Sequence, residues 1–105
     1  MAKATVKPGV CGFETQVDVE VDAATYQAKI AISSQCRHVQ KLAEELGEVD
    51  AMEVITKRIT ETPVYQAASR AKLHAACPVP CAVIKAIEVA AGLALPAAVH
   101  IDLEK

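Results

Sequence analysis

The sequence predicts an α+β fold: a mainly antiparallel sheet of three to four strands with helices covering one face. Two early stretches alternate between apolar and polar residues, several later stretches repeat apolar residues at helical spacing, and a last stretch alternates again. Strands followed by helices, with one strand to close, is an element order typical of α+β domains. The chain has 105 residues, 52% of them apolar, so residues 1–105 are expected to form a single domain with a small core.

The first third of the chain predicts three strands. Residues 2–6 form a short strand that ends before a Pro-Gly pair, and residues 13–21 and 25–32 each place apolar side chains at every second position. The side chains expected to face inward are Phe13, Thr15, Val17, Val19 and Val21 on one strand, and Tyr26, Ala28, Ile30 and Ile32 on the next.

A hairpin is expected to join the two longer strands through residues 22–25. Pairing Val21 with Tyr26 keeps both apolar sets on one face, whereas a slip of one residue would separate them. The same register sets Asp18 opposite Lys29, which is a favourable cross-strand pair.

Helices are expected after the hairpin. The first begins at Ser33 or Ser34 as N-cap and stops at Gly47, Pro63 opens the third, and Gly92 ends the fourth. The predicted ranges are 33–47, 48–59, 63–76 and 77–93.

A closing strand is expected at residues 98–105, where Val99, Ile101 and Leu103 alternate with polar residues, and His100 faces outward. The apolar stretch that precedes this segment is interrupted by charged residues, a glycine and a proline, so no membrane span is expected.

Composition and charge exclude several classes of protein. The net charge is −2 and the lysines and arginines are scattered, which argues against a nucleic-acid partner. The N-terminus has no apolar core typical of a secretory signal, so a cytoplasmic location is expected. No glycine-rich phosphate loop, paired-carboxylate site or serine triad is present.

The four cysteines are the main functional signal. In a reducing compartment they are expected to be metal ligands or reactive thiols rather than disulfides, although four inert buried thiols are an alternative. The predicted hairpin register, extended past the strand ends, brings Cys11 opposite Cys36. Cys36 also falls in the first turn of its predicted helix.

The segment Cys-Pro-Val-Pro-Cys predicts a rigid helix start. With Cys77 as N-cap, Pro78 and Pro80 occupy positions whose N–H groups a helix leaves unpaired in any case. Cys77 and Cys81 are four residues apart, so they share one side of the first turn. Thiols at helix N-termini favour the thiolate, the form that metals and sulfur chemistry require.

Three hypotheses follow. If the two pairs meet, Cys11, Cys36, Cys77 and Cys81 form a four-thiolate site for an iron–sulfur cluster, or alternatively for zinc. Such a protein would serve in electron transfer, in cluster delivery or as an accessory to a larger enzyme, with a protein partner and with homodimerisation left open. The second hypothesis is a sulfur-carrier or thiol-redox protein with Cys77 as nucleophile and Cys81 as resolving thiol, and the third is an interaction domain with structural cysteines.

Three charged or titratable residues lie near the cysteines in the sequence. His38 follows Cys36 by two residues and lies off its face of the helix, so a surface position is expected, with metal ligation or pairing with a thiolate as the alternative. His74 would raise the thiolate fraction of Cys77 if the turn between them folds back. Arg37 would stabilise a thiolate or a bound anion, but an exposed charge is the default interpretation.

Two resemblances bear on the cysteines. The stretch "CPVPCAVIKAIEVA" resembles the CPxP motif of TusA-type sulfur-carrier proteins, in which the motif opens a helix and its cysteine carries a persulfide. The resemblance implies a reactive role for Cys77, and Lys85 falls where a basic residue often follows. Cys81 replaces the usual aliphatic residue, and a predicted helix replaces the strand that normally precedes the motif.

Over the whole chain, "VCGFETQV", "SSQCRHV", "CPVPCAVIKA" and "GLALP" together resemble a small uncharacterised single-domain family of anaerobic prokaryotes. An anaerobic setting tolerates exposed iron–sulfur chemistry. The resemblance implies no particular activity.

Overall fold

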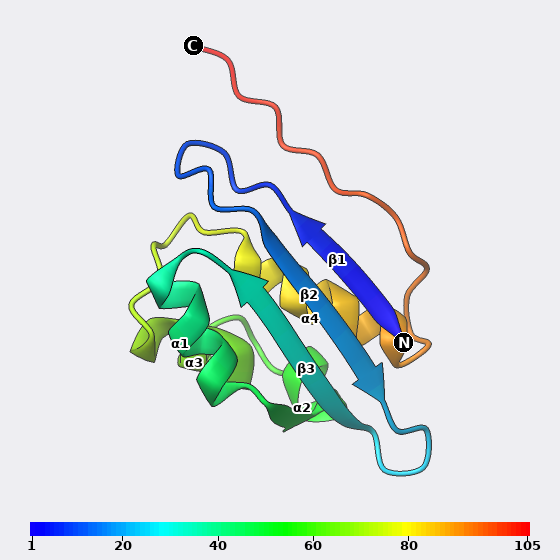
Figure 1. Cartoon of the computed structure of the whole chain (residues 1–105). Helices are drawn as coiled ribbons and strands as arrows, with labels where there is room; N and C mark the ends of the chain where they lie inside the picture. Colours follow the sequence, from blue (N-terminus) through cyan, green and yellow to red (C-terminus); the bar gives the residue numbers. More distant parts are fainter.

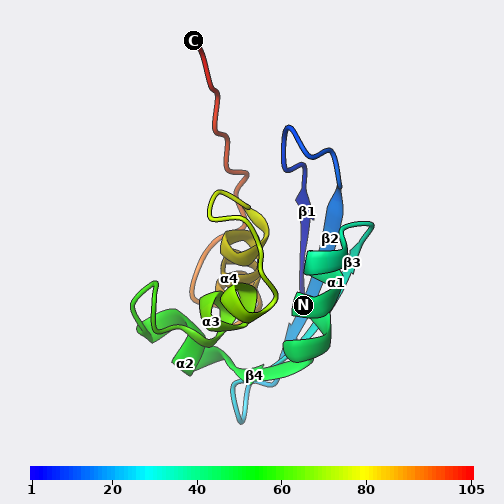
Figure 2. The same ribbon diagram turned by 90° about the vertical axis from the view of Figure 1, so that its left-hand side faces the viewer.

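The computed structural model describes residues 1–105 and contains four strands and four helices. In chain order they are β1 (Ala2–Val6), β2 (Thr15–Val21), β3 (Gln27–Ser34), α1 (Arg37–Glu45), β4 (Glu48–Asp50), α2 (Ala51–Thr56), α3 (Pro63–Arg70) and α4 (Val79–Ala90). The strands form one antiparallel sheet in the order β1-β2-β3-β4. Helices α2, α3 and α4 lie on one side of it, with α4 against β1 and β2, while α1 packs beside β3 (Figures 1 and 2). The predicted α+β fold is confirmed.

The core lies between the sheet and the helices and is aliphatic. Alternate residues of β2 are buried, which confirms the face predicted for Thr15, Val17 and Val19. The largest fully buried side chains are Leu42, Leu46, Ile87, Val17, Val19, Val54, Val64, Val79, Val83, Thr15 and Thr62.

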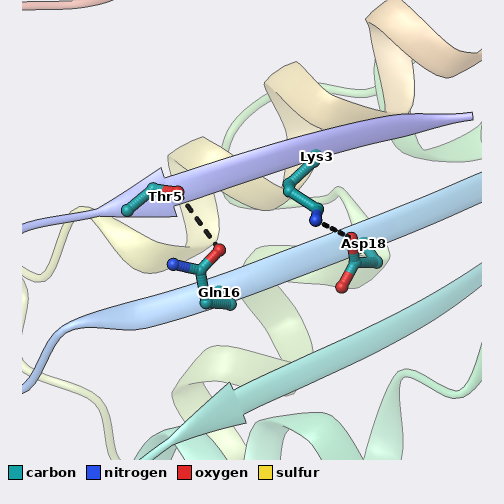
Figure 3. A network of polar contacts seen from close by, with 4 residues as sticks. All are labelled: Lys3, Thr5, Gln16 and Asp18. Atoms are coloured by element: carbon teal, nitrogen blue, oxygen red, sulfur yellow. Dashed lines mark hydrogen bonds and ion pairs between the residues drawn. The ribbon is translucent and has the colours of Figure 1, made fainter.

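The opposite face of the sheet carries polar side chains. Between β1 and β2, Lys3 forms an ion pair with Asp18 (Nζ to Oδ1, 3.9 Å), and the Thr5 hydroxyl donates to Gln16 Oε1 at 3.1 Å (Figure 3). Each pair joins residues that lie directly opposite one another in the register. One face of the sheet is therefore apolar and covered while the other is polar, which is the usual origin of alternation in antiparallel strands.

The hairpin register predicted from the sequence is wrong by two residues. Val21 lies opposite Ala28 rather than Tyr26, although the shift of two keeps the same side chains inward. The reason is the loop: Tyr26 has a φ of 58°, in the left-handed region, and its N–H donates to the carbonyl of Asp22 at 2.7 Å. Tyr26 therefore belongs to the turn and lies outside the ladder.

The corrected register removes two expectations. Lys29 lies opposite Glu20 rather than Asp18, and the register when extended no longer aligns Cys11 with Cys36. The inward positions predicted for the two aromatic residues are also wrong, because Phe13 and Tyr26 fall in loops and are exposed.

The first helix begins later than predicted. Ser34 remains in β3 opposite Thr15, because strand pairing extends two residues beyond the predicted strand end. Cys36 is therefore the N-cap residue in place of Ser33 or Ser34, and its N–H donates to the hydroxyl of Ser34 at 3.1 Å.

The second predicted helix divides into β4 and α2, and α3 is shorter than predicted. β4 pairs with the start of β3 and ends at Asp50. The carboxylate of Asp50 accepts hydrogen bonds from the backbone N–H groups of Met52 (2.9 Å) and Glu53 (3.4 Å), so the same residue caps α2. A strand of three residues is too short for alternation to distinguish it from the helix that follows.

No strand forms after α4. The helix ends before Gly92, whose φ is 77°, and residues 93–105, here called the C-terminal tail, run back past α4 and the outer side of β1 and end beyond the β1–β2 loop (Figures 1 and 2). Val99, Ile101 and Leu103 are 59%, 74% and 90% exposed, so their predicted inward positions are wrong in this structure. A strand needs another backbone beside it, and the tail has none. None of the helices has the length and apolar character needed to cross a bilayer.

Candidate functional site

The four cysteines are free thiols at the ends of elements. Cys11 is exposed in the loop between β1 and β2, Cys36 is the half-buried N-cap of α1, Cys77 is half-buried just before α4, and Cys81 is exposed in the first turn of α4.

The topology brings these positions to one end of the molecule. The β1–β2 loop leaves Val6, which lies opposite Thr15, and Thr15 in turn lies opposite Ser34 at the end of β3. The start of α4 lies at the same end, at the upper left of Figure 1 and at the top of the ribbon body in Figure 2. The sheet and α4 thus gather three separate chain segments, although the register that predicts Cys11 opposite Cys36 is wrong.

The helix start differs from the prediction by one residue. Pro78, not Cys77, is the N-cap of α4, so Val79 and Pro80 form its first two positions. The first hydrogen bond of the helix places the cap there, since the Pro78 carbonyl accepts from the N–H of Ala82 at 3.0 Å. Between the two prolines, Val79 supplies the available N–H, which forms a hydrogen bond to the Cys77 thiol.

The thiol of Cys77 lies close to two of the other cysteines. Burial raises its pKa, the hydrogen bond from the Val79 N–H lowers it, and negative charge at Cys11 and Cys36 raises it further. The net shift is upward, so the prediction that the helix start favours the Cys77 thiolate is wrong. The single N–H is outweighed by burial and by two like-charged neighbours.

Tyr65 joins the fourth cysteine to this group. Burial raises the pKa of the Tyr65 hydroxyl, and negative charge at Cys81 and then at Cys77 raises it further. The hydroxyl therefore stays protonated and able to donate a hydrogen bond. Sequence reasoning did not identify Tyr65: it lies in α3, well before Cys77 in the chain, and nothing in its sequence context indicates a role.

The thiols are near one another without forming a ready single-ion site. No three side chains among the His, Cys, Asp and Glu residues lie close enough together to hold one metal ion in this arrangement. The donor set itself, four thiols, has the chemistry that zinc and iron–sulfur clusters use. We call Cys11, Cys36, Cys77, Cys81 and Tyr65 the thiol cluster.

A family model matches residues 2–103, that of a family of unknown function (DUF6951). The chain belongs to this family. The match supports the sequence-based resemblance to a small uncharacterised family that extends over the whole chain. No curated protein and no solved structure matches the chain.

The side chains of His38, His74 and Arg37, the other residues considered from the sequence, are exposed and are not part of the thiol cluster. His38 is exposed as predicted, and its Nδ1 lies 3.0 Å from the carbonyl oxygen of Ala71, which links α1 to the end of α3. The carbonyl of His74 accepts a hydrogen bond from the Cys77 N–H at 3.0 Å, while its side chain is exposed. Arg37 is exposed and takes part in neither of the two ion pairs of the molecule.

Proposed function

We propose that the protein is a small metal-binding module that holds an iron–sulfur cluster, with zinc as the alternative, through the thiolates of Cys11, Cys36, Cys77 and Cys81. The observation that carries the proposal is topological: the β1–β2 loop, the start of α1 and the start of α4, which hold the four cysteines, meet at one end of the molecule.

The electrostatics of the thiol cluster favour a cation. Each cysteine that ionises makes the ionisation of Cys77 harder, and the one influence that lowers the pKa of Cys77 is the Val79 N–H. No basic side chain compensates there. A bound metal ion supplies the missing positive charge, and metal binding releases the thiol protons in exchange.

The thiols are not arranged as a site for a single ion. With Zn–S bonds of about 2.3 Å, the sulfurs of a tetrahedral zinc site lie about 3.8 Å apart. No three potential ligands are arranged so closely here, yet their charges influence one another. A cluster of several iron and sulfide ions is larger than one ion and needs ligand sulfurs that stand further apart.

The surroundings of the thiols suit a redox or delivery role. When bound, an iron–sulfur cluster accepts and donates single electrons, with a potential that depends on solvent exposure and on hydrogen bonds to sulfur. Cys11 and Cys81 are exposed, which leaves this end of the molecule accessible to a protein partner. The Val79 N–H supplies a hydrogen-bond donor to Cys77. A reducing cytoplasm would keep the four thiols free.

The test is anaerobic reconstitution of the purified protein with ferrous iron and sulfide, and separately with zinc, followed by iron, sulfide and zinc analysis and visible absorption spectra. We expect bound iron and sulfide, lost in each of the four Cys→Ser variants. Gln35→Ala, an exposed change beside Cys36, is the matched control and should retain them. A colourless, metal-free protein with four titratable thiols after reconstitution would refute the proposal.

The sulfur-carrier alternative rests on the CPxP resemblance. It requires the Cys77 thiolate to attack a persulfide donor, forming a new persulfide on Cys77 and releasing the donor's thiolate. The raised pKa of Cys77 is unfavourable for this step. Intact mass after incubation with a persulfide donor tests it, and one added sulfur atom, absent in Cys77→Ser but present in Cys81→Ser, would support this alternative.

A further inference from the structure

The outer edge of β1 is a free sheet edge to which another strand can add. β1 is the end strand of the sheet, so one side of its backbone has no neighbouring strand. An edge of this kind exposes unpaired N–H and C=O groups and is a template for another strand. Natural sheets usually cover or shorten such edges, and no strand of this chain pairs with the outer edge of β1.

The C-terminal tail has the sequence pattern of a strand but pairs with no other segment. Residues 94–105 form no hydrogen bond with the rest of the chain, and no helix or strand follows α4. Yet Val99, Ile101 and Leu103 alternate with polar residues as the side chains of β2 do. The tail therefore has the side-chain pattern of a half-buried strand, and its apolar side chains are left in solvent.

The outer edge of β1 and the C-terminal tail match in the polarity of their faces. On β1, Ala2 and Val6 are buried on the side that α4 covers, while Lys3 and Lys7 are exposed on the other side or just beyond the strand. A strand added at this edge would place its apolar residues over the flank of α4, continuing the core.

The same placement would match the charges. The polar side of the tail carries Asp102 and Glu104, and a strand at the edge of β1 would bring these carboxylates to the face that carries Lys3, already paired with Asp18, with Lys7 just beyond the strand end. Parity alone sets this match, so it holds for either strand direction.

The tail turns back after α4 and runs along the outer side of its own β1 (Figure 1), yet it forms no hydrogen bond with that strand. Gly92 ends the helix with a positive φ, and Pro96 keeps the connection extended. In both ribbon views the tail ends beyond the β1–β2 loop, away from the strands (Figures 1 and 2). An extended connection of this kind favours exchange of a strand between identical chains.

We propose that the tail of one copy adds as a fifth strand to the β1 edge of a second copy, and that the second copy does the same in return. The product is a symmetric dimer built by tail exchange, with backbone hydrogen bonds along β1 and burial of Val99, Ile101 and Leu103.

The test uses light scattering during size-exclusion chromatography of the full chain, with reductant and chelator present so that metal cannot join two copies. We expect twice the 11.1 kDa mass of one chain. The variant Ile101→Asp/Leu103→Asp should be monomeric and folded, with the far-UV circular dichroism spectrum of wild type diluted to the monomer, since these residues do not pack on their own chain. His100→Ser, on the opposite side of the same segment, is the matched control and should remain dimeric.

Two further variants test the charges. Lys3→Glu/Lys7→Glu should weaken the dimer at least tenfold in dissociation constant, and Asp102→Lys/Glu104→Lys in the same chain should restore it. If the wild-type chain is monomeric at about 0.1 mM, the proposal is overturned. This holds even if the tail amides resist hydrogen exchange, because protection in a monomer would mean that the tail pairs within its own chain. A dimer that survives Ile101→Asp/Leu103→Asp would also overturn it. None of these outcomes depends on whether the thiol cluster binds metal.

Discussion

Helix α4 and the C-terminal tail are consecutive apolar segments of the chain, and only α4 packs. Val83 and Ile87 of α4 are completely buried, whereas Ile101 and Leu103 of the tail are mostly exposed. Each segment has the apolar period of its element, 3.6 residues for the helix and 2 for the strand. A helix satisfies its backbone hydrogen bonds internally, but a strand must find a second backbone. The pattern therefore specifies the kind of element, and the neighbours decide whether a strand forms.

The largest difference between the two segments should appear on truncation of matched isoleucines. Ile87→Ala should lower the free energy of unfolding by about 2–5 kcal/mol, because it leaves a cavity in the core. Ile101→Ala should change it by less than about 0.5 kcal/mol at concentrations where the chain is monomeric. Urea denaturation followed by circular dichroism measures both, and similar losses at the two sites would remove the distinction.

A smaller effect is expected at the buried connection that leads into α3. The Thr62 hydroxyl donates to the Val54 carbonyl at 2.7 Å, and Thr62 is fully buried. Thr62→Val keeps the shape and removes the donor, so it should cost about 1–3 kcal/mol. Thr60→Val, at an exposed position nearby, is the matched control and should stay within about 0.5 kcal/mol of wild type. The prediction fails if thermal or urea unfolding gives both variants the same stability.

The N-cap residue of α2, Asp50, can be compared with an aspartate of the tail, Asp102. Asp50→Ala removes the acceptor for two N–H groups of the first turn and should cost about 1 kcal/mol. Asp102→Ala, in the tail, should leave the stability of the monomer unchanged. The two variants differ in sequence context but not in chemistry, so equal urea midpoints would contradict the role assigned to Asp50.

The smallest effect concerns the pH dependence of stability at the start of α4. The folded-state pKa of Cys77 is raised, so its contribution to stability is complete below the unfolded thiol pKa of about 8.5 and is lost as the pH rises through the folded value. Unfolding free energies of the metal-free protein, measured in reductant from neutral to alkaline pH, should fall less steeply in Cys77→Ser than in wild type. Cys81→Ser is the comparison variant and should keep most of the slope. Parallel curves for wild type and Cys77→Ser would show that packing does not disfavour the thiolate.

Much of the fold follows from local pattern. The alternation around Val17 and Val19 and the helical spacing around Leu42 and Ile87 identify the buried faces correctly. The register was wrong because one residue, Tyr26, adopts a left-handed backbone conformation that its sequence context does not indicate. β4 was missed because three residues hold too little pattern, and the closing strand was predicted because a pattern is present without a partner.

The candidate site divides in the same way. Residue type and sequence position predict Cys11, Cys36, Cys77 and Cys81 as metal ligands, since all four lie in loops or at predicted helix starts. The participation of Tyr65 was not predictable, because α3 and α4 meet only after folding. The sign of the Cys77 shift was predicted wrongly for the same reason: the helix start is visible in the sequence, while burial is not.

The α+β class, the aliphatic core and the four thiols as candidate reactive groups all follow from the amino-acid sequence, because periodicity and side-chain chemistry are properties of short segments. Three other features arise only on folding: the position of three cysteine-bearing segments at one end of the sheet, the raised pKa of Cys77 and the lack of a partner for the last apolar segment. These outcomes depend on burial, on the charges of neighbours and on free backbone edges, all of which arise between residues far apart in the chain.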